Sequence, residues 1–195
     1  TMIGKITPNE DSSYVSYQGA GTLIYNGSLG QNVTKTEFTS IAGSAPANLT
    51  INNPLGVTFP PAIPSRTLPG ALSMLLGNLA LGTDTLSLTN GTLVNQLNYS
   101  SGYITSGTLG RSYPTSALPT TAVTKSQFPF GSGVNNRSLY VFFSNTSLVG
   151  GTGGMIYVTH TPVVGVATIS PAVADNGINL DKRTKTFWKV TTGTF

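Results

Sequence analysis

Residues 139–169 read LYVFFSNTSLVGGTGGMIYVTHTPVVGVATI, and this stretch decides the fold class. It holds three short runs rich in Val, Ile, Tyr, Phe and Thr, at 139–143, 155–161 and 163–169. Such runs, bounded by Gly, Ser and Asn, are typical of β-strands. The glycines of 150–154 favour a hairpin turn between the first two runs. A phosphate-binding loop would continue into Lys-Ser or Lys-Thr, which is absent here.

The same pattern extends toward both ends of the chain. Residues 15–25 alternate with a period of two and lead into Asn26-Gly27, a dipeptide that favours hairpins because both residues tolerate positive φ. The last strand is expected at 186–195, TFWKVTTGTF. We therefore expect an all-β fold, an Ig-like or pilin-like β-sandwich, with a jelly roll as the alternative.

One segment carries helix signals. Thr67 is suited to an N-cap, Pro69 to the first turn, and Gly82 to a stop, so at most one short helix is expected near 68–81. We see no internal repeat and no domain boundary. The expected organisation is an N-terminal tail at 1–13 and a single β-sandwich domain at 14–195.

The composition offers few charged residues and no cysteine for catalysis or metal binding. Thr, Ser, Asn and Gly make up about 45% of the 195 residues, charged residues only 8%, and there is no cysteine. This excludes a disulfide scaffold and a cysteine zinc site, and the 38% of hydrophobic residues argues against disorder driven by charge. An uncharged, hydroxyl-rich protein with a structural role remains.

Candidate catalytic residues are few. His160 could pair with a serine, with Asp175 as the third member, but in MIYVTHT it more simply occupies one face of a sheet. Glu10 and Asp11 lie in a loop-like stretch, and the other acids are far apart in sequence. We expect no enzyme activity, no catalytic residues, no metal site and no cofactor.

Charge and hydropathy also limit the partners. Four of the ten basic residues are Lys182, Arg183, Lys185 and Lys189, too small a cluster for a nucleic-acid reader. The apolar segment 71–81 is shorter than the roughly 20 residues of a membrane helix, so no membrane span is expected. Because Thr1 opens the chain without a basic and apolar leader, we expect a mature extracellular protein whose signal peptide has been removed.

The N-x-[ST] acceptor of N-glycosylation recurs, and random placement of the same residues would give only about four copies. Glycans would supply the solvation that the few charges do not, so N-linked glycans are expected. The acceptor asparagines are Asn26, Asn32, Asn48, Asn90, Asn98, Asn136 and Asn145.

The N-terminal tail points to a partner. Residues 1–13, TMIGKITPNEDSS, precede the first convincing strand, and Met2, Gly4 and Ile6 alternate as in a strand. An uncommitted terminus of this kind can add a strand to a neighbouring subunit. A head-to-tail contact that does not close generates a filament. A frayed end is the alternative, and 186–195 is a second candidate donor.

Taken together, the all-β pattern, the absence of cysteine, the Thr/Ser/Asn/Gly-rich composition, the free N-terminal segment and the acceptor asparagines resemble the subunits of archaeal extracellular filaments. The similarity is to the glycosylated thread pilins, and it covers the whole chain without a diagnostic motif. The resemblance implies a pilin-like β-sandwich joined by donor-strand complementation. The donor strand would then be Met2, Ile3, Gly4, Lys5, Ile6 and Thr7.

The sequence thus predicts a subunit of a cell-surface, pilus-like filament that forms a homopolymer and serves adhesion and biofilm formation. A viral coat or tail-fibre protein would share the β content, but it would form closed shells or trimers. A secreted carbohydrate-binding module would use Trp188, Tyr99 or Tyr103 as a sugar platform.

Overall fold

A computed structural model describes residues 17, 20–38, 44–61, 65–92, 96–121, 126–133, 135–147, 153–161, 166–175, 178–184 and 187–193. For 166–175, 178–184 and 187, the backbone alone is described. The expected donor strand, Met2 to Thr7, lies outside the described residues, as do Glu10 and Asp11.

The described chain is all-β, as predicted, and it contains strands and turns but no helix. The strands are β1 (Thr22–Tyr25), β2 (Gln31–Asn32), β3 (Asn48–Asn52), β4 (Val57–Thr58), β5 (Arg66–Leu68), β6 (Leu72–Leu76), β7 (Leu79–Leu88), β8 (Leu97–Tyr99), β9 (Ile104–Tyr113), β10 (Ser126–Phe128), β11 (Gly131–Ser132), β12 (Asn135–Asn136), β13 (Leu139–Val141), β14 (Gly154–Thr161), β15 (Val166–Asp175), β16 (Ile178–Thr184) and β17 (Phe187–Thr192).

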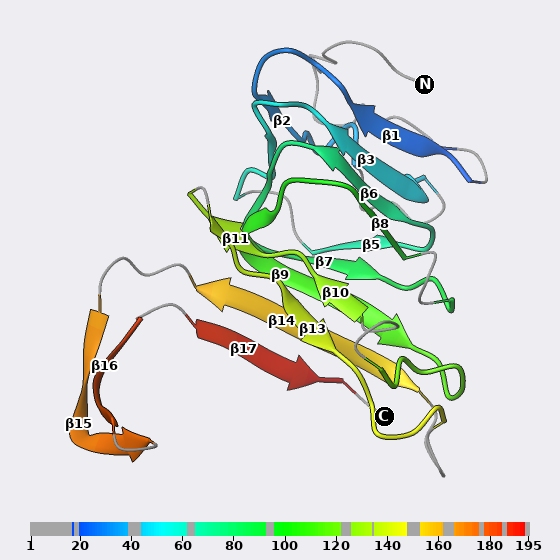
Figure 1. Ribbon diagram of the computed structural model, residues 1–195. Helices are drawn as coiled ribbons and strands as arrows, with labels where there is room; N and C mark the ends of the chain where they lie inside the picture. Colours follow the sequence, from blue (N-terminus) through cyan, green and yellow to red (C-terminus); the bar gives the residue numbers. More distant parts are fainter. Residues whose placement is uncertain are drawn as a thin grey trace.

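Strands β1, β3, β6 and β8 form a four-stranded sheet in which every pair is parallel. The strands are stacked side by side (Figure 1), and their paired residues form columns across the sheet. One column contains Leu23, Leu49, Leu72 and Leu97. A second column contains Tyr25, Ile51, Met74 and Tyr99.

Strands β2, β4, β7 and β9 form the parallel part of a second, seven-stranded sheet. Val57, Leu79 and Ile104 form one of its buried columns. Each strand of the first sheet is followed in the chain by a strand of the second, so the chain winds through successive rungs as a β-solenoid.

This winding corrects three expectations. The strands of an Ig-like, pilin-like or jelly-roll sandwich are mostly antiparallel, whereas these rungs stack parallel. The chain also has an internal structural repeat, the rung, which we did not expect. Asn26-Gly27 does not close a hairpin, because β1 and β2 on either side of it belong to different sheets.

The corner between the two sheets explains why the rungs turn where they do. Gly77 and Gly102 have φ of +84° and +78°, in the left-handed region that favours glycine. A Cβ on Gly77 would overlap the carbonyl oxygen of Asn53, and one on Gly102 would overlap that of Gly77. The stacked corners are therefore too tight for any other residue.

The short helix expected near 68–81 is wrong. This segment contains the end of β5, all of β6 and the start of β7. Leu72, Met74 and Leu79 are buried in columns of the two sheets, whereas Leu75 and Leu76 are exposed. A short apolar run of this kind cannot be told from a helix by periodicity alone. The positive φ of Gly77 would have ended a helix in the middle of the segment.

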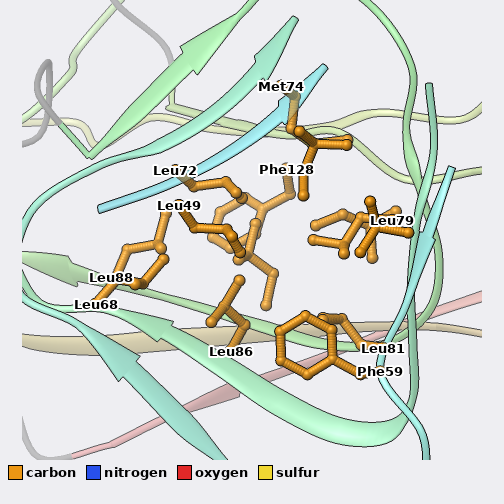
Figure 2. Packing of buried hydrophobic residues seen from close by; sticks show 14 of the residues in the cluster. Leu49, Phe59, Leu68, Leu72, Met74, Leu79, Leu81, Leu86, Leu88 and Phe128 are labelled. Atoms are coloured by element: carbon orange, nitrogen blue, oxygen red, sulfur yellow. The ribbon is translucent and has the colours of Figure 1, made fainter. Parts of the chain in front are cut away.

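The core lies between the two sheets (Figure 2). Both sheets contribute inward side chains from successive rungs, and Phe128 of β10 is fully buried in the same cluster. The labelled residues of the core are Leu49, Phe59, Leu68, Leu72, Met74, Leu79, Leu81, Leu86, Leu88 and Phe128.

After β9 the second sheet changes direction. β14 pairs antiparallel with β9, and β17 pairs antiparallel with β14. The predicted strands at 139–143, 155–161 and 186–195 are confirmed over most of their lengths as β13, β14 and β17. The hairpin at 150–154 is wrong, because β13 pairs with β10 and not with β14.

Strands β15 and β16 form an antiparallel ribbon that projects from the rest of the molecule (Figure 1). Asp175 pairs with Ile178, so only Asn176 and Gly177 connect the two strands. The ribbon lies between β14 and β17 in the chain and forms a two-stranded sheet of its own.

Candidate functional site

The open edge of the second sheet is the candidate functional site. In the described part of the chain, β17 pairs with β14 alone, and its other side faces no strand. At the opposite end of the same sheet, β2 pairs with β4 alone. Unpaired N–H and C=O groups along a sheet edge are a template for pairing with another chain.

The core-facing side chains of β17 are only partly covered. Trp188 lies opposite His160 and Val190 opposite Val158 in the antiparallel register, so all four residues point to the same side of the sheet. Val158 and His160 are buried, whereas Trp188 is 39% exposed and Val190 is 51% exposed. The core face of the sheet therefore extends one strand beyond the side chains that cover it.

Trp188 is held in place by two contacts. Its ring centroid is 5.9 Å from that of His160, which in turn lies 5.8 Å from the ring of Phe130. Its indole Nε1 donates a hydrogen bond of 3.1 Å to the carbonyl oxygen of Arg137. These contacts hold Trp188 against the body of the protein.

Within the described residues, His160 is not hydrogen-bonded to a serine or to a carboxylate. Neither ring nitrogen has a hydrogen-bond partner within the described residues, and the side chain is buried among aromatic rings. Asp175 is at the far end of β15 on the projecting ribbon. Burial lowers the pKa of His160, and the charge of Arg137 lowers it further.

The first rung is closed by a buried carboxylate. Glu37 Oε2 accepts hydrogen bonds from the Tyr25 hydroxyl at 3.2 Å and from the Thr34 backbone N–H at 3.0 Å. Thr34 Oγ1 accepts one from the Glu37 N–H at 3.1 Å, a reciprocal capping arrangement. Burial and Glu37 together raise the pKa of Tyr17 to about 12 and raise that of Tyr25 as well.

Most acceptor asparagines lie on the surface, although two are half-buried. The exposed ones are Asn26, Asn32, Asn98, Asn136 and Asn145, and the half-buried ones are Asn48 and Asn90. The amide of Asn48 bridges two neighbouring segments, because Nδ2 donates to the Ala20 carbonyl at 3.1 Å and Oδ1 accepts from the Ala71 N–H at 2.8 Å. Asn48 therefore has a structural role.

The three aromatic residues considered for sugar binding all contact the short β11–β12 hairpin or the residue after it. The Tyr99 hydroxyl accepts a hydrogen bond of 3.3 Å from Asn136 Nδ2. A Cβ on Gly131 would lie 2.5 Å from the ring of Tyr103, so that ring packs directly on the hairpin backbone. Trp188 reaches Arg137, as described above.

The C-terminal segment, the second candidate donor, pairs within its own sheet as β17. Sequence reasoning treated it as a strand but missed the exposure of its core-facing side. The signal was present as alternating Trp188 and Val190 in a strand at the end of the chain.

Comparison of this chain with protein-family models, with curated proteins and with solved structures returns no match. Within the described residues, no group of three or more His, Asp or Glu side chains could hold a metal ion. The same residues include no helix that could cross a membrane.

Proposed function

We propose that this protein is a structural subunit of a glycosylated, extracellular cell-surface filament. The subunits would polymerise head-to-tail, each donating its N-terminal strand from Met2 to Thr7 to the next, and the filament would serve adhesion and biofilm formation. The observation that carries this proposal is the seven-stranded sheet, which is open at β2 on one side and at β17 on the other. A subunit with two open sheet edges can form a chain of copies without closing.

The surface supports the same function. The chain has few charges, and the exposed acceptor asparagines are spread over β2, β8, β12 and two loops. N-linked glycans at these positions would keep the filament solvated. The similarity in composition to archaeal thread pilins supports the proposal, although the rungs seen here are not a pilin-like sandwich.

Two experiments on native material test the proposal. Negative-stain electron microscopy should show filaments, and removal of N-glycans should reduce the intact mass. Deletion of residues 1–13 should leave monomers. Closed shells or trimers in place of filaments would instead favour a viral coat or tail-fibre protein, and truncated subunits that still polymerise would exclude the N-terminal donor.

The contacts of Tyr99, Tyr103 and Trp188 with residues 131–137 favour a second candidate, a carbohydrate-binding module. Aromatic rings gathered on one hairpin offer apolar surface and polar tips on which a sugar could pack. Binding of the soluble monomer on a glycan array, lost in Tyr103→Ala and retained in Tyr157→Ala, would support this function.

A further inference from the structure

We propose that Arg137 and three aromatic side chains near it, Trp188, Tyr99 and Tyr140, form a binding site for an acidic sugar, the charged unit of an extracellular polysaccharide. This inference rests on the adhesive, sugar-binding role proposed above and names the class of ligand that the site would take.

The guanidinium group of Arg137 carries a charge that no described side chain neutralises. Its Nε is buried and has no hydrogen-bond partner within the described residues, and the side chain as a whole is half-buried. The two acids whose side chains the structure describes lie elsewhere, Glu37 in the first rung and Asp84 near Arg66. A charge withdrawn from water without a counter-ion costs free energy, so this position favours a ligand that brings a negative group.

His160 lies near Arg137 and does not compensate its charge. Both ring nitrogens of His160 are buried without a hydrogen-bond partner in the described part of the chain. Burial lowers the pKa of His160 and the charge of Arg137 lowers it further, so the imidazole is neutral at pH 7. The neutral ring supports Trp188, whose ring centroid lies 5.9 Å away.

The backbone of the site is held on both sides of the arginine side chain. The Arg137 N–H donates a hydrogen bond of 2.7 Å to the carbonyl oxygen of Phe130. The Arg137 carbonyl oxygen accepts a hydrogen bond of 3.1 Å from Nε1 of Trp188. A site whose backbone is already ordered loses less freedom when a ligand binds, and this favours affinity.

Aromatic side chains lie close to this arginine. Trp188 and Tyr140 are both exposed. The Tyr99 hydroxyl accepts a hydrogen bond of 3.3 Å from Asn136, the residue before Arg137. Burial raises the pKa of Tyr99, the bond from Asn136 lowers it, and the nearby Tyr140 raises it, so the two tyrosines are neighbours. Rings with an apolar body and a polar tip suit a sugar, which has both kinds of surface.

Arginine also suits the negative group of an acidic sugar. Its guanidinium offers N–H donors in a planar fork that can bind two oxygens of one carboxylate or one sulfate group. Uronic acids carry the first of these groups, and sulfated sugars carry the second. The charge of Arg137 thus selects an anion, and the aromatic side chains select a sugar as its carrier.

Isothermal titration calorimetry tests the site on full-length subunits from a host without N-glycosylation, so that no glycan on Asn136 covers it. The probe is tetragalacturonic acid, and its fully methyl-esterified form is the matched neutral ligand. We expect the acid to bind about tenfold more tightly than the ester, because only the acid forms charge-assisted hydrogen bonds. A sulfated cellotetraose that binds more tightly than the acid would assign the natural anion as sulfate. Equal binding of acid and ester, or binding of neither acidic probe, would overturn the inference.

Three variants assign the binding to these residues. Arg137→Met removes the charge and keeps an apolar stem, and Trp188→Ala removes one ring, so each should weaken binding of tetragalacturonic acid about tenfold. Lys189→Met removes a charge from the opposite face of β17 and should change binding by less than about twofold, because that side chain is exposed. Equal losses in Arg137→Met and Lys189→Met would show a non-specific attraction to a positive protein and no site.

Stability and assembly separate the inference from its alternatives. Arg137→Met should not lower the urea midpoint of unfolding, because the charge that it removes has no partner; a clear fall would show that an acid of the chain neutralises Arg137. Polyglutamate that binds as tightly as tetragalacturonic acid would favour an acidic peptide and overturn the sugar. Normal filaments that bind no acidic sugar would reject this site and leave the filament function intact. Subunits that bind acidic sugar and form no filaments would keep the site and reject the filament.

Discussion

Val190 lies directly opposite Val158 on neighbouring strands, yet Val158 is completely buried and Val190 is 51% exposed. The two valines share one face of one sheet and differ only in the number of strands that flank them. Val158 on β14 is flanked by β9 and β17, whereas Val190 on β17 has a neighbour on one side only. At Val190, therefore, the core side of the sheet is no longer covered by other side chains.

This difference predicts opposite effects in the monomer and in the filament. Val158→Ala should lower the free energy of unfolding of the isolated subunit by about 2 kcal/mol, because it removes two buried methyl groups. Val190→Ala should change it by less than about 0.5 kcal/mol, since the side chain is half in water. Urea unfolding of subunits lacking residues 1–13 measures both values.

In full-length chains, we expect Val190→Ala to impair polymerisation more than Val158→Ala does, the reverse of their order of effect on stability. Val190→Ala should weaken filament formation, measured by sedimentation, while Val158→Ala should leave it intact as long as the subunit is folded. Equal polymerisation of Val190→Ala and the unmodified chain would show that β17 is not a contact surface.

The corner glycines predict a severe effect from a single methyl group. Gly77→Ala requires a positive φ for alanine and also places Cβ against the Asn53 carbonyl, so we expect a loss of at least about 3 kcal/mol or failure to fold. Gly91→Ala is the matched control, because within the described residues no atom beyond its chain neighbours lies within 4 Å of the added Cβ, and its φ is not positive. Thermal unfolding of the two variants should separate them clearly, and a stable Gly77→Ala variant would contradict this account of the corner.

The antiparallel strands of this fold could be predicted from the sequence. Alternation in 155–161 and 186–195 predicted β14 and β17, because side chains of successive strand residues point to opposite faces of the sheet. In β14 one of these faces is buried, whereas residues 188–192 of β17 are all exposed. The parallel stacking of the rungs could not be predicted from local alternation. Leu23, Leu49, Leu72 and Leu97 stack in one column, but they recur at unequal spacing, and the loops between them differ in length and composition.

The candidate site was only partly readable for a similar reason. The strand character of the C-terminal segment could be seen in the sequence, but whether Trp188 and Val190 are covered depends on which strands lie beside them. Asn48 shows the same limit, because its acceptor motif looks like the others while its amide bridges Ala20 and Ala71. Such contacts join residues far apart in the chain, and no local pattern reports them.

His160 predicts a dependence of stability on acid. Burial and Arg137 hold its pKa below the ordinary value of 6.5, so the unfolded chain binds a proton more readily than the folded one. Stability should therefore be complete above pH 6.5 and should fall as the pH drops below this value. In His160→Phe this part of the dependence should disappear.

The measurement is the urea midpoint of unfolding at several pH values between 7.5 and 5. The slope of this midpoint against pH is compared between the two proteins, because His160→Phe also changes packing against Phe130 and Trp188 and so shifts the midpoint itself. Carboxylates elsewhere contribute equally to the curves of both proteins. Identical slopes would mean that His160 stays neutral, or finds a proton acceptor, throughout this range.

The two classes of acceptor asparagine predict different results on substitution. Asn48→Ala removes an amide that donates to one segment and accepts from another, and it leaves the Ala71 N–H without its partner, so we expect a loss of about 1–3 kcal/mol in stability. Asn145→Ala, at an exposed loop position, should change stability by less than about 0.5 kcal/mol. Peptide mapping of native material should find glycan at Asn145 and an unmodified Asn48, because a glycan on Asn48 replaces one of its two amide hydrogens and adds bulk beside the Ala20 carbonyl. A glycan found at Asn48 in folded protein would mean that this bridge opens, and Asn48→Ala should then cost no more stability than Asn145→Ala.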